Sequence, residues 1–386
     1  MKFSGYRRPD GKVGVRNHVV VMPGVLCADV AARKIAAASG ATYLQNPYGC
    51  GQTQADTART LHILSGLLAS PNVYGALIVG LGCEALGEGR YREAIEARTP
   101  DKPIQYISIQ ACSGIGKTVE NGIRIIAEIK AEAGKCEKSD CDISELILGL
   151  ECGGSDPTSG ISSNVVLGEV SDRIVDMGGT AVISETVEAI GAESILRERG
   201  ATPEIGQAIY DCVQQKDMAF AAICENIRES NPSPGNIRGG ISTLEEKSLG
   251  CINKSGTRPF TALVGYGDPV TIKGVSFMDT TAFDPASTTA KVAGGCQIVA
   301  FTTGLGNPIG CAIAPVIKMT GNRNTYEMLT DIIDFDSSVT LTGEKTVGQS
   351  ADELMELIIR VCSGEPVKAE INEAGTIAID HFHMLA

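Results

Sequence analysis

Apolar runs of strand length alternate with amphipathic segments of helix length through the first 135 residues. This alternation predicts βαβ units, in which helices join parallel strands, and right-handed crossovers then make the sheet doubly wound. The expected strands are 17–27, 41–45, 72–82 and 103–110, and the expected helices are 29–39, 53–70, 84–98 and 117–133.

A polar segment, GKCEKSDCDIS at 134–144, interrupts this pattern, and the alternation resumes after it. Strands are expected at 145–152 and 179–185, helices at 162–177, 187–199, 203–229 and 352–364, and shorter strands with Gly, Pro and Thr turns from residue 258 onwards.

The predicted fold class is α/β, with two Rossmann-like parallel-sheet units that carry helices on both faces, plus a C-terminal region of shorter strands. The polar interruption divides the chain. We expect an N-terminal α/β domain at 1–135, a linker at 136–144 and a C-terminal α/β catalytic domain at 145–386.

The charge balance is acidic, with 46 Asp and Glu against 33 Lys and Arg among 386 residues and a formal net charge of −13. No cluster of basic residues stands out, which disfavours binding to nucleic acid or to an anionic membrane surface. No apolar run reaches the length of a membrane span, and the N-terminus lacks the apolar core of a signal peptide. We therefore expect a cytoplasmic homo-oligomer with reduced thiols.

Five of the thirteen cysteines directly follow apolar, strand-like runs: Cys27, Cys50, Cys83, Cys112 and Cys152. In an open parallel sheet the carboxyl ends of the strands face one crevice, where ligands bind. Thiols delivered to one crevice favour a metal or iron–sulfur centre over a disulfide framework. Cys251 and the remaining cysteines are interpreted as core or surface thiols.

Three of these cysteines lie in glycine-rich turns, in the segments GCG, GLGCE and ECGG. Cys50, Cys83 and Cys152 would supply three thiolates. Such a set suits an iron–sulfur cluster with one open iron, or a single Fe²⁺ or Zn²⁺ ion with an open position. An open position is what a Lewis-acid lyase needs, because a substrate oxygen can then bind the metal.

The segment ECGGSDPTSG at 151–160 predicts a strand that runs into a helix through Gly153, Gly154, Ser155 and Asp156. Glycines allow close approach of the backbone, and the start of a helix offers N–H groups to an anion. The alternative is an ordinary turn with Ser155 or Asp156 as the helix cap.

Lys247, in LEEKSLG, is a candidate general base or partner of a substrate carboxylate, or a member of a solvated helix with Glu/Lys pairs. FTTGLG contains Thr302 and Thr303, and it forms either a backbone nest for a carboxylate or only a tight turn.

A P-loop is the rival hypothesis, because ACSGIGKT at 111–118 lies between a predicted strand and a predicted helix. The protein would then bind a nucleotide. Against this function, no apolar strand ends in an Asp that could hold Mg²⁺, and the loop has fewer glycines than the strict motif.

Several motifs together resemble the altronate/galactarate dehydratase family, and the resemblance covers most of the chain. They are GYRRPDGKVGVRN (5–17), GCG (49–51), GLGCE (80–84), ECGGSDPTSG (151–160), SETVEAIGAE (184–193), NPSPGNIRGG (231–240), EEKSLG (245–250), FTTGLG (301–306) and PVIKM (315–319). The resemblance implies an iron-dependent lyase that eliminates water from a sugar acid and leaves a 2-keto-3-deoxy acid. A related branch of the family is the large subunit of sulfolactate sulfo-lyase, which eliminates sulfite.

The resemblance also implies roles for single residues. Iron, as Fe²⁺ or as a [4Fe–4S] cluster with one open iron, would be held by Cys50, Cys83 and Cys152, and Lys247 or Glu185 would be the base. The small anionic hydroxy acid would be bound by Arg16, Asn17, Gly153, Gly154, Ser155, Asp156, Asn236, Thr302 and Thr303.

Two features depart from the pattern of the sugar-acid branch. The chain starts at the GYRRPDG motif, as the two-subunit sulfo-lyase type does, so we expect a separate small partner subunit. Asn46 stands where the dehydratases have the His of H-x-x-G-C-G, and this difference leaves the identity of the substrate open.

Overall fold

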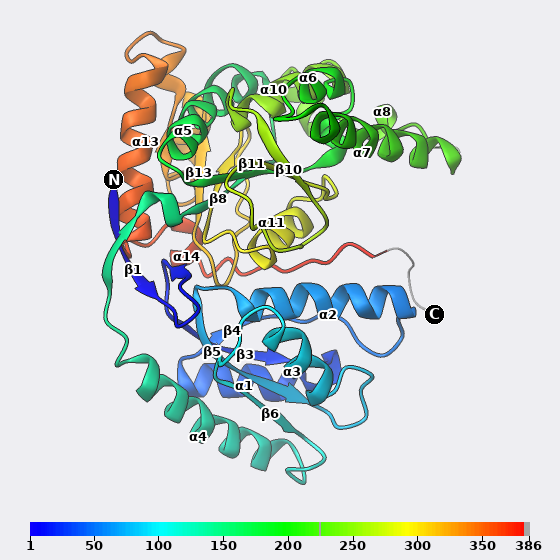
Figure 1. Ribbon diagram of the computed structural model, residues 1–386, viewed down its shortest axis with the longest axis vertical. Helices are drawn as coiled ribbons and strands as arrows, with labels where there is room; N and C mark the ends of the chain where they lie inside the picture. The colour runs from blue at the N-terminus through cyan, green and yellow to red at the C-terminus, as the bar shows by residue number, and fades with distance from the viewer. Residues whose placement is uncertain (224, 382–386) are drawn as a thin grey trace.

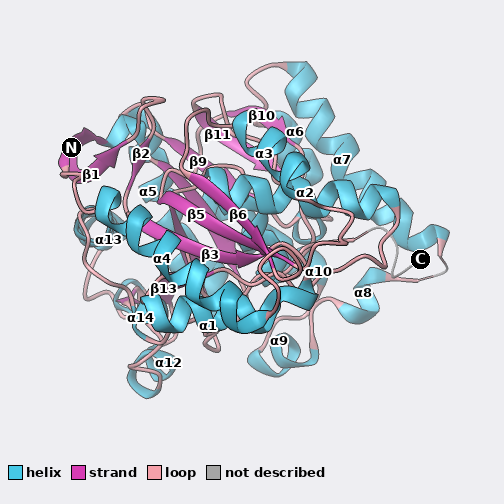
Figure 2. Cartoon of the chain, turned by 90° about the horizontal axis from the view of Figure 1, so that it is seen from below, coloured by secondary structure: helices cyan, strands magenta, loops and turns pink. Residues whose placement is uncertain are grey.

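The computed structural model describes residues 1–223 and 225–381, and its lower half in Figure 1 is a four-stranded parallel sheet in the order β4-β3-β5-β6. Helices α1 and α4 cover one face, and α2 and α3 lie on the other (Figures 1 and 2). The alternation expected from the sequence is therefore present. The bounds are β3 (His18–Pro23), β4 (Thr42–Tyr43), β5 (Val73–Gly80), β6 (Ile104–Ser108), α1 (Asp29–Ser39), α2 (Gln54–Ala69), α3 (Glu88–Glu96) and α4 (Ile115–Ala133).

The upper half of the molecule contains a seven-stranded parallel sheet in the order β10-β11-β9-β8-β12-β13-β14. The short C-terminal strands extend this sheet on both sides of β8 and β9, and the predicted α/β fold class is confirmed. The bounds are β8 (Ile147–Cys152), β9 (Thr180–Ile183), β10 (Phe260–Val264), β11 (Gly274–Met278), β12 (Ile298–Thr302), β13 (Val316–Thr320) and β14 (Phe335–Asp336).

Two expected helices are shorter than the sequence pattern indicates. The segment 187–199 becomes a 3-10 turn (Thr186–Ala189) followed by α6 (Glu193–Glu198), because Gly191 has a φ of 90° and interrupts the helix. A single helix was expected over 203–229, but the helix that begins there, α7 (Pro203–Ala222), ends earlier. Around the sheet lie α5 (Asn164–Asp176), α8 (Ile227–Ser230), α9 (Pro234–Gly239), α10 (Leu244–Ile252), α11 (Asp284–Ala293), α12 (Arg323–Met328), α13 (Val347–Cys362) and α14 (Lys368–Ile371).

A small antiparallel sheet connects the two halves. Strand β1 (Lys2–Arg7) pairs with β2 (Val13–Gly14) on one side and with β7 (Ser139–Asp142) on the other. The segment 136–144, expected as a linker, therefore contains a strand that pairs with the N-terminal residues. The proposed division into two domains stays a prediction.

The two parallel-sheet units share one hydrophobic core. It runs from Ile78 of β5 through Leu64 of α2 to Ala290 of α11 without a break. Helices α2 and α11 pack closely, because a Cβ on Gly66 would lie 2.6 Å from the carbonyl oxygen of Ala293. None of the described helices combines the length and apolarity needed to cross a membrane.

Arg16 joins the N-terminal unit to the C-terminal helices. Its Nε and Nη2 donate to the two carboxylate oxygens of Glu370 at 2.7 and 2.8 Å, and its remaining N–H groups donate to the carbonyl oxygens of Val15, Val361 and Glu365. All five N–H groups are used within the protein, so none is left for a substrate carboxylate. Only 12% of the Arg16 side chain is exposed.

We predict that Arg16→Ala lowers the free energy of unfolding by about 2–4 kcal/mol, because it removes the cation paired with the largely buried Glu370 and the donors to three carbonyl groups. Arg7→Ala is the matched control, since Arg7 makes the same kind of bidentate pair with Glu145 but is 46% exposed. Denaturant unfolding of both variants should show a much larger loss for Arg16→Ala. Equal losses would contradict this structural role.

Candidate functional site

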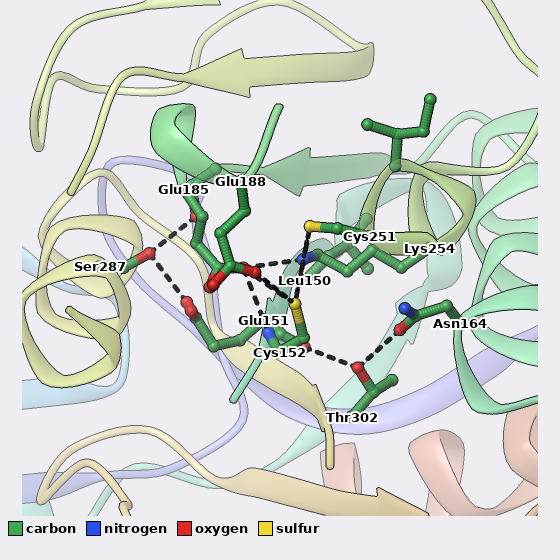
Figure 3. Close-up of polar contacts among 12 residues, drawn as sticks. Leu150, Glu151, Cys152, Asn164, Glu185, Glu188, Cys251, Lys254, Ser287 and Thr302 are labelled. Atoms are coloured by element: carbon green, nitrogen blue, oxygen red, sulfur yellow. Dashed lines mark hydrogen bonds and ion pairs between the residues drawn. The ribbon is translucent and has the colours of Figure 1, made fainter. Parts of the chain in front are cut away.

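Polar and sulfur-containing side chains meet above the carboxyl ends of β8 and β9 (Figure 3). Cys152 is the last residue of β8, and Glu185 follows β9, the neighbouring strand. Glu188 lies in the next 3-10 turn, and Cys251 comes from α10. We call Cys152, Glu185, Glu188 and Cys251 the Cys/Glu cluster; all four residues are buried.

The ligand atoms of the Cys/Glu cluster are close enough to bind one cation. The Cys152 thiol lies 3.3 Å from Glu188 Oε2, 3.5 Å from Glu185 Oε2 and 3.6 Å from the Cys251 sulfur. One ligand atom from each of the four residues lies within 4.8 Å of the others. Two sulfur and two oxygen donors suit a single Fe²⁺ or Zn²⁺ ion.

Ammonium groups surround the cluster and balance its charge. Lys254 Nζ lies 2.7 Å from Glu185 Oε2 and 2.9 Å from both sulfur atoms. Lys247 Nζ forms an ion pair with Glu188 at 2.6 Å. Burial alone would lower the pKa of each lysine, but the adjacent acidic groups raise the pKa of both above its usual value, so both are cations.

The pKa values of two acidic members of the cluster are raised as well, which favours their neutral forms. The hydrogen bond with Cys251, followed by burial, raises the pKa of the Cys152 thiol well above its usual value. Burial, followed by the charge of Glu151, raises the pKa of Glu185 to about 7. Without a metal ion the thiol of Cys152 is therefore protonated, and binding of a metal ion would release this proton.

The backbone at Glu185 is in the left-handed region, with φ of 70° and ψ of 60°. This conformation costs a non-glycine residue about 1–3 kcal/mol. The Glu185 N–H donates to Thr280 Oγ1 at 2.9 Å, which helps to hold the turn. Strain of this kind is concentrated at functional sites, and here it occurs at a residue of the cluster.

A cavity of about 250 Å³ adjoins the cluster. Ser155, Asp156 and Ser159 line one side, and Lys247 and Cys251 line another. The segment Ser159–Ser163 is a π-helical turn that leads into α5. Turns of this type are frequent at functional sites.

The structure brings several residues predicted from the sequence to this cavity or its wall. Cys152, Glu185, Lys247, Ser155 and Asp156 belong to the cluster or the cavity. Asn236 donates to the Ser155 carbonyl oxygen at 2.8 Å and accepts from Lys247 at 3.3 Å.

The glycine and threonine residues of the prediction lie in turns or at a strand end beside the cluster and do not line the cavity. A Cβ on Gly153 would lie 2.0 Å from Asp284 Oδ2, and Gly154 has a φ of 61°. Thr302 Oγ1 donates to Asn164 Oδ1 at 2.6 Å, whereas Thr303 Oγ1 accepts from the Gly306 N–H within its own loop. These residues shape the turn beside the cluster.

Other predicted residues lie elsewhere. Cys50 and Cys83 are exposed, in loops that follow β4 and β5 of the other sheet. Among the described residues neither belongs to a group of three or more possible ligands. Asn17 accepts from Arg8 and donates to the Ala133 carbonyl oxygen.

Asn46, which replaces the His of the family motif, has a structural role in its loop. Its Nδ2 donates to the Pro23 carbonyl oxygen at 3.0 Å, and its Oδ1 accepts from the Tyr48 N–H at 3.1 Å. The side chain is 1% exposed. It therefore fixes the path of the GCG loop.

Sequence reasoning did not identify Cys251, Lys254 and Glu188 as members of the site. Lys247, Cys251 and Lys254 are spaced i, i+4 and i+7, which places them on one face of a helix. Glu185 and Glu188 are spaced i, i+3 in the segment SETVEA. These spacings are the signals that point to the cluster.

The donor set also bears on the type of cofactor. A [4Fe–4S] cluster takes cysteine thiolates, and the structure offers two sulfur atoms here instead of three. Cys152 and Cys251 with the two glutamates fit a mononuclear ion such as Fe²⁺.

Comparison with known proteins identifies relatives of both halves of the chain. Residues 5–134 match the family described as "D-galactarate dehydratase/Altronate hydrolase, second domain", and residues 143–384 match "D-galactarate/Altronate dehydratase, C-terminal". An "Altronate dehydratase" of Bacillus subtilis (strain 168) is 36% identical over 98% of this chain and 77% of the relative. The corresponding values for an "Altronate dehydratase" of Escherichia coli (strain K12) are 32%, 97% and 76%.

A third relative carries a different activity in its name. It is the "(2R)-sulfolactate sulfo-lyase subunit beta" of Chromohalobacter salexigens, which is 34% identical over 95% of this chain and 94% of the relative. Dehydratases and a sulfo-lyase are thus similar to the same chain.

We predict that Cys152→Ser and Cys251→Ser each lower the thiolate-to-metal charge-transfer absorption of the Co²⁺-loaded protein by about half or more, because each removes one of the two sulfur ligands. Cys50→Ser and Cys83→Ser serve as controls and should keep this absorption. A weaker absorption in Cys50→Ser, Cys83→Ser and Cys152→Ser, with Cys251→Ser unchanged, would restore the three-thiolate arrangement expected from the sequence.

Proposed function

The chain belongs to the D-galactarate/altronate dehydratase family, and from this premise we propose that it is a metal-dependent hydro-lyase for a sugar acid. It is a lyase, as its relatives are. The proposed reaction removes water from a 2,3-dihydroxy carboxylate such as altronate or galactarate and leaves a 2-keto-3-deoxy acid. One observation carries this proposal: the buried Cys/Glu cluster adjoins a cavity that has an ammonium group on its wall.

The cavity offers a local positive charge to an anionic substrate. The protein as a whole is acidic, with a formal net charge of −13, so long-range attraction does not favour an anion. Lys247 Nζ lines the cavity and is held by Glu188, by Asn231 Oδ1 at 2.9 Å and by Asn236 Oδ1 at 3.3 Å. We infer that the substrate carboxylate or hydroxyl binds beside this ammonium.

We assign the proton transfers to the pair of Lys247 and Glu188. Glu188 is 4% exposed and is in direct contact with the lysine of the cavity wall. As a carboxylate it can accept the proton from C2 of the substrate, and the Lys247 ammonium can donate a proton to the leaving hydroxide. The C2–H and C3–O bonds break, water leaves, and the enol tautomerises to the 2-keto acid.

Glu185, which the sequence indicated as a base, fits another role better. Its carboxylate is fully buried and is paired with Lys254 at 2.7 Å, whereas Glu188 is paired with Lys247 of the cavity wall. We therefore place it with Cys152 and Cys251 as a group that would hold the metal. A divalent cation bound there would act as a Lewis acid toward substrate oxygens and stabilise the charge that develops when the C2 proton leaves.

Elimination of sulfite is the second candidate function, because the sulfo-lyase subunit is similar to nearly the whole chain. The same cavity and proton transfers can serve a sulfonate leaving group at C3. The word "subunit" in the name of this relative also supports our proposal that a separate small subunit acts with this chain.

We predict that Glu188→Gln lowers kcat by about 10²–10⁴-fold because the proton acceptor is lost. The protein should keep its metal, because Cys152, Cys251 and Glu185 remain as donors. Glu185→Gln should lose the metal itself. Metal content after dialysis, measured together with the rate of 2-keto acid formation, separates the two cases. Glu229→Gln, an exposed change on α8, is the control and should alter neither quantity. Wild-type activity in Glu188→Gln would refute its role as acceptor.

The substrate class can be tested directly. The protein, purified without oxygen, loaded with Fe²⁺ and supplied with its small subunit where one exists, should form a 2-keto acid from a sugar acid and release no sulfite from sulfolactate. Release of sulfite with no turnover of sugar acids would establish the second function. Failure with every hydroxy acid in both classes would overturn the proposal.

A further inference from the structure

A second group of acidic side chains lies beside the Cys/Glu cluster, toward α11. It consists of Glu151 at the end of β8, Glu185 after β9 and Asp284 at the start of α11. One oxygen from each of the three carboxyl groups lies within 4.8 Å of the others. We call these three residues the carboxylate site; unlike the Cys/Glu cluster, it contains only oxygen donors.

Two of these carboxyl groups have an oxygen without any partner. Glu151 Oε2 forms an ion pair with Lys291. It also accepts from Ser287 Oγ at 2.9 Å, and Glu185 Oε2 accepts from Lys254 (Figure 3). The other oxygen of each, Oε1, is buried and has no hydrogen-bond partner among the described residues. Both side chains are 0% exposed, so water does not solvate these atoms.

Buried polar atoms are nearly always paired, and a carboxylate oxygen that lacks a donor carries a large desolvation cost. Two such atoms, on neighbouring strands of one sheet, indicate that a positively charged species belongs between them. An acidic cluster on the surface carries no such implication, because water satisfies its oxygens.

Asp284 supplies the third carboxyl group. It is less buried than the two glutamates, and Asn307 Nδ2 donates to its Oδ2 at 2.7 Å. Gly153 allows this approach, because a Cβ at that position would lie 2.0 Å from Asp284 Oδ2. The turn ECGGSD thus admits the aspartate to the site.

We propose that the carboxylate site binds a hard divalent cation, of the Mg²⁺ or Mn²⁺ type, in addition to the ion of the Cys/Glu cluster. Lys254 and Lys291 pair with Glu185 and Glu151, whereas Asp284 forms no ion pair with a described residue. Oxygen ligands of one such ion lie no more than about 4.8 Å apart, for bonds of about 2.1–2.4 Å. Three oxygen atoms within 4.8 Å of one another can therefore reach the same ion. Oxygen-only donors favour such cations, whereas the thiols favour softer ones.

Glu185 belongs to both groups, so the two cations would share one carboxylate. Its Oε2 is directed to Cys152 and Lys254, and its Oε1 is the unpaired atom. The proposal rests on these carboxyl groups and not on the lyase activity, and its test measures binding alone.

The test uses the full-length, metal-free protein under reducing conditions, titrated with Mn²⁺ and followed by the loss of the electron paramagnetic resonance signal of the free ion. The wild-type protein should bind Mn²⁺. Asp284→Asn should weaken binding at least tenfold, because it removes one of three charged ligands, whereas Cys251→Ser should change it less than threefold. Asp211→Asn, an exposed change on α7, is the control for loss of charge.

Glu151→Gln is a second variant, expected to show the same tenfold loss, and thermal melting of each variant confirms that it is folded. The proposal is overturned when folded Asp284→Asn and Glu151→Gln bind Mn²⁺ as the wild-type protein does. It is also overturned when Cys251→Ser abolishes binding, which would place the ion in the Cys/Glu cluster. Absence of Mn²⁺ binding to the wild-type protein would overturn it as well, and the two unpaired oxygens would then share a proton.

Discussion

The pairing of buried charges is the constraint on which the site depends. Three glutamates and three lysines lie together in the interior as Glu151–Lys291, Glu185–Lys254 and Glu188–Lys247. A buried charge that loses its partner typically destabilises a protein by about 3–5 kcal/mol. Each ion pair links two different elements of the fold. The three pairs therefore also fix the positions of β8, α10 and α11 around the thiols.

The topology explains how residues so far apart in the chain form one site. Glu151 and Lys291 are 140 residues apart, and Cys152 and Cys251 are 99 apart. Parallel strands end at the same side of the sheet, and β8 and β9 are neighbours, so their last residues meet. The left-handed turn at Glu185 then directs the chain into the segment that carries Glu188. The ion pairs around Glu185 hold its backbone in this strained conformation.

The periodic pattern of the sequence was sufficient to predict the alternating strands and helices, because buried parallel strands and amphipathic helices have clear signatures. It was also sufficient to single out Cys152 and Glu185, each at the end of a predicted strand, and Lys247 in the segment LEEKSLG. It did not show that the cysteines are divided between two sheets. The prediction assumed one crevice, whereas the chain forms two separate parallel sheets, with Cys50 and Cys83 at one and Cys152 at the other. Cys251 reaches Cys152 only through the packing of α10, which no local pattern specifies.

Charge accounting connects the parts of the proposed mechanism. Without a bound metal ion, the three ammonium groups pair with the three glutamates. The Cys152 thiol then stays protonated, because its hydrogen bond with Cys251 and its burial raise its pKa. When a divalent cation binds the two sulfur atoms as thiolates, two negative charges appear with two positive ones, so the buried region keeps its neutrality. The substrate carboxylate adds a negative charge that the Lys247 ammonium can meet only by sharing its contact with Glu188. When Lys247 shares its ammonium in this way, its contact with Glu188 weakens and Glu188 can accept a proton from the substrate. Substrate binding therefore activates the base. Lys247 is the lysine that makes this possible, because no other described lysine lines the cavity.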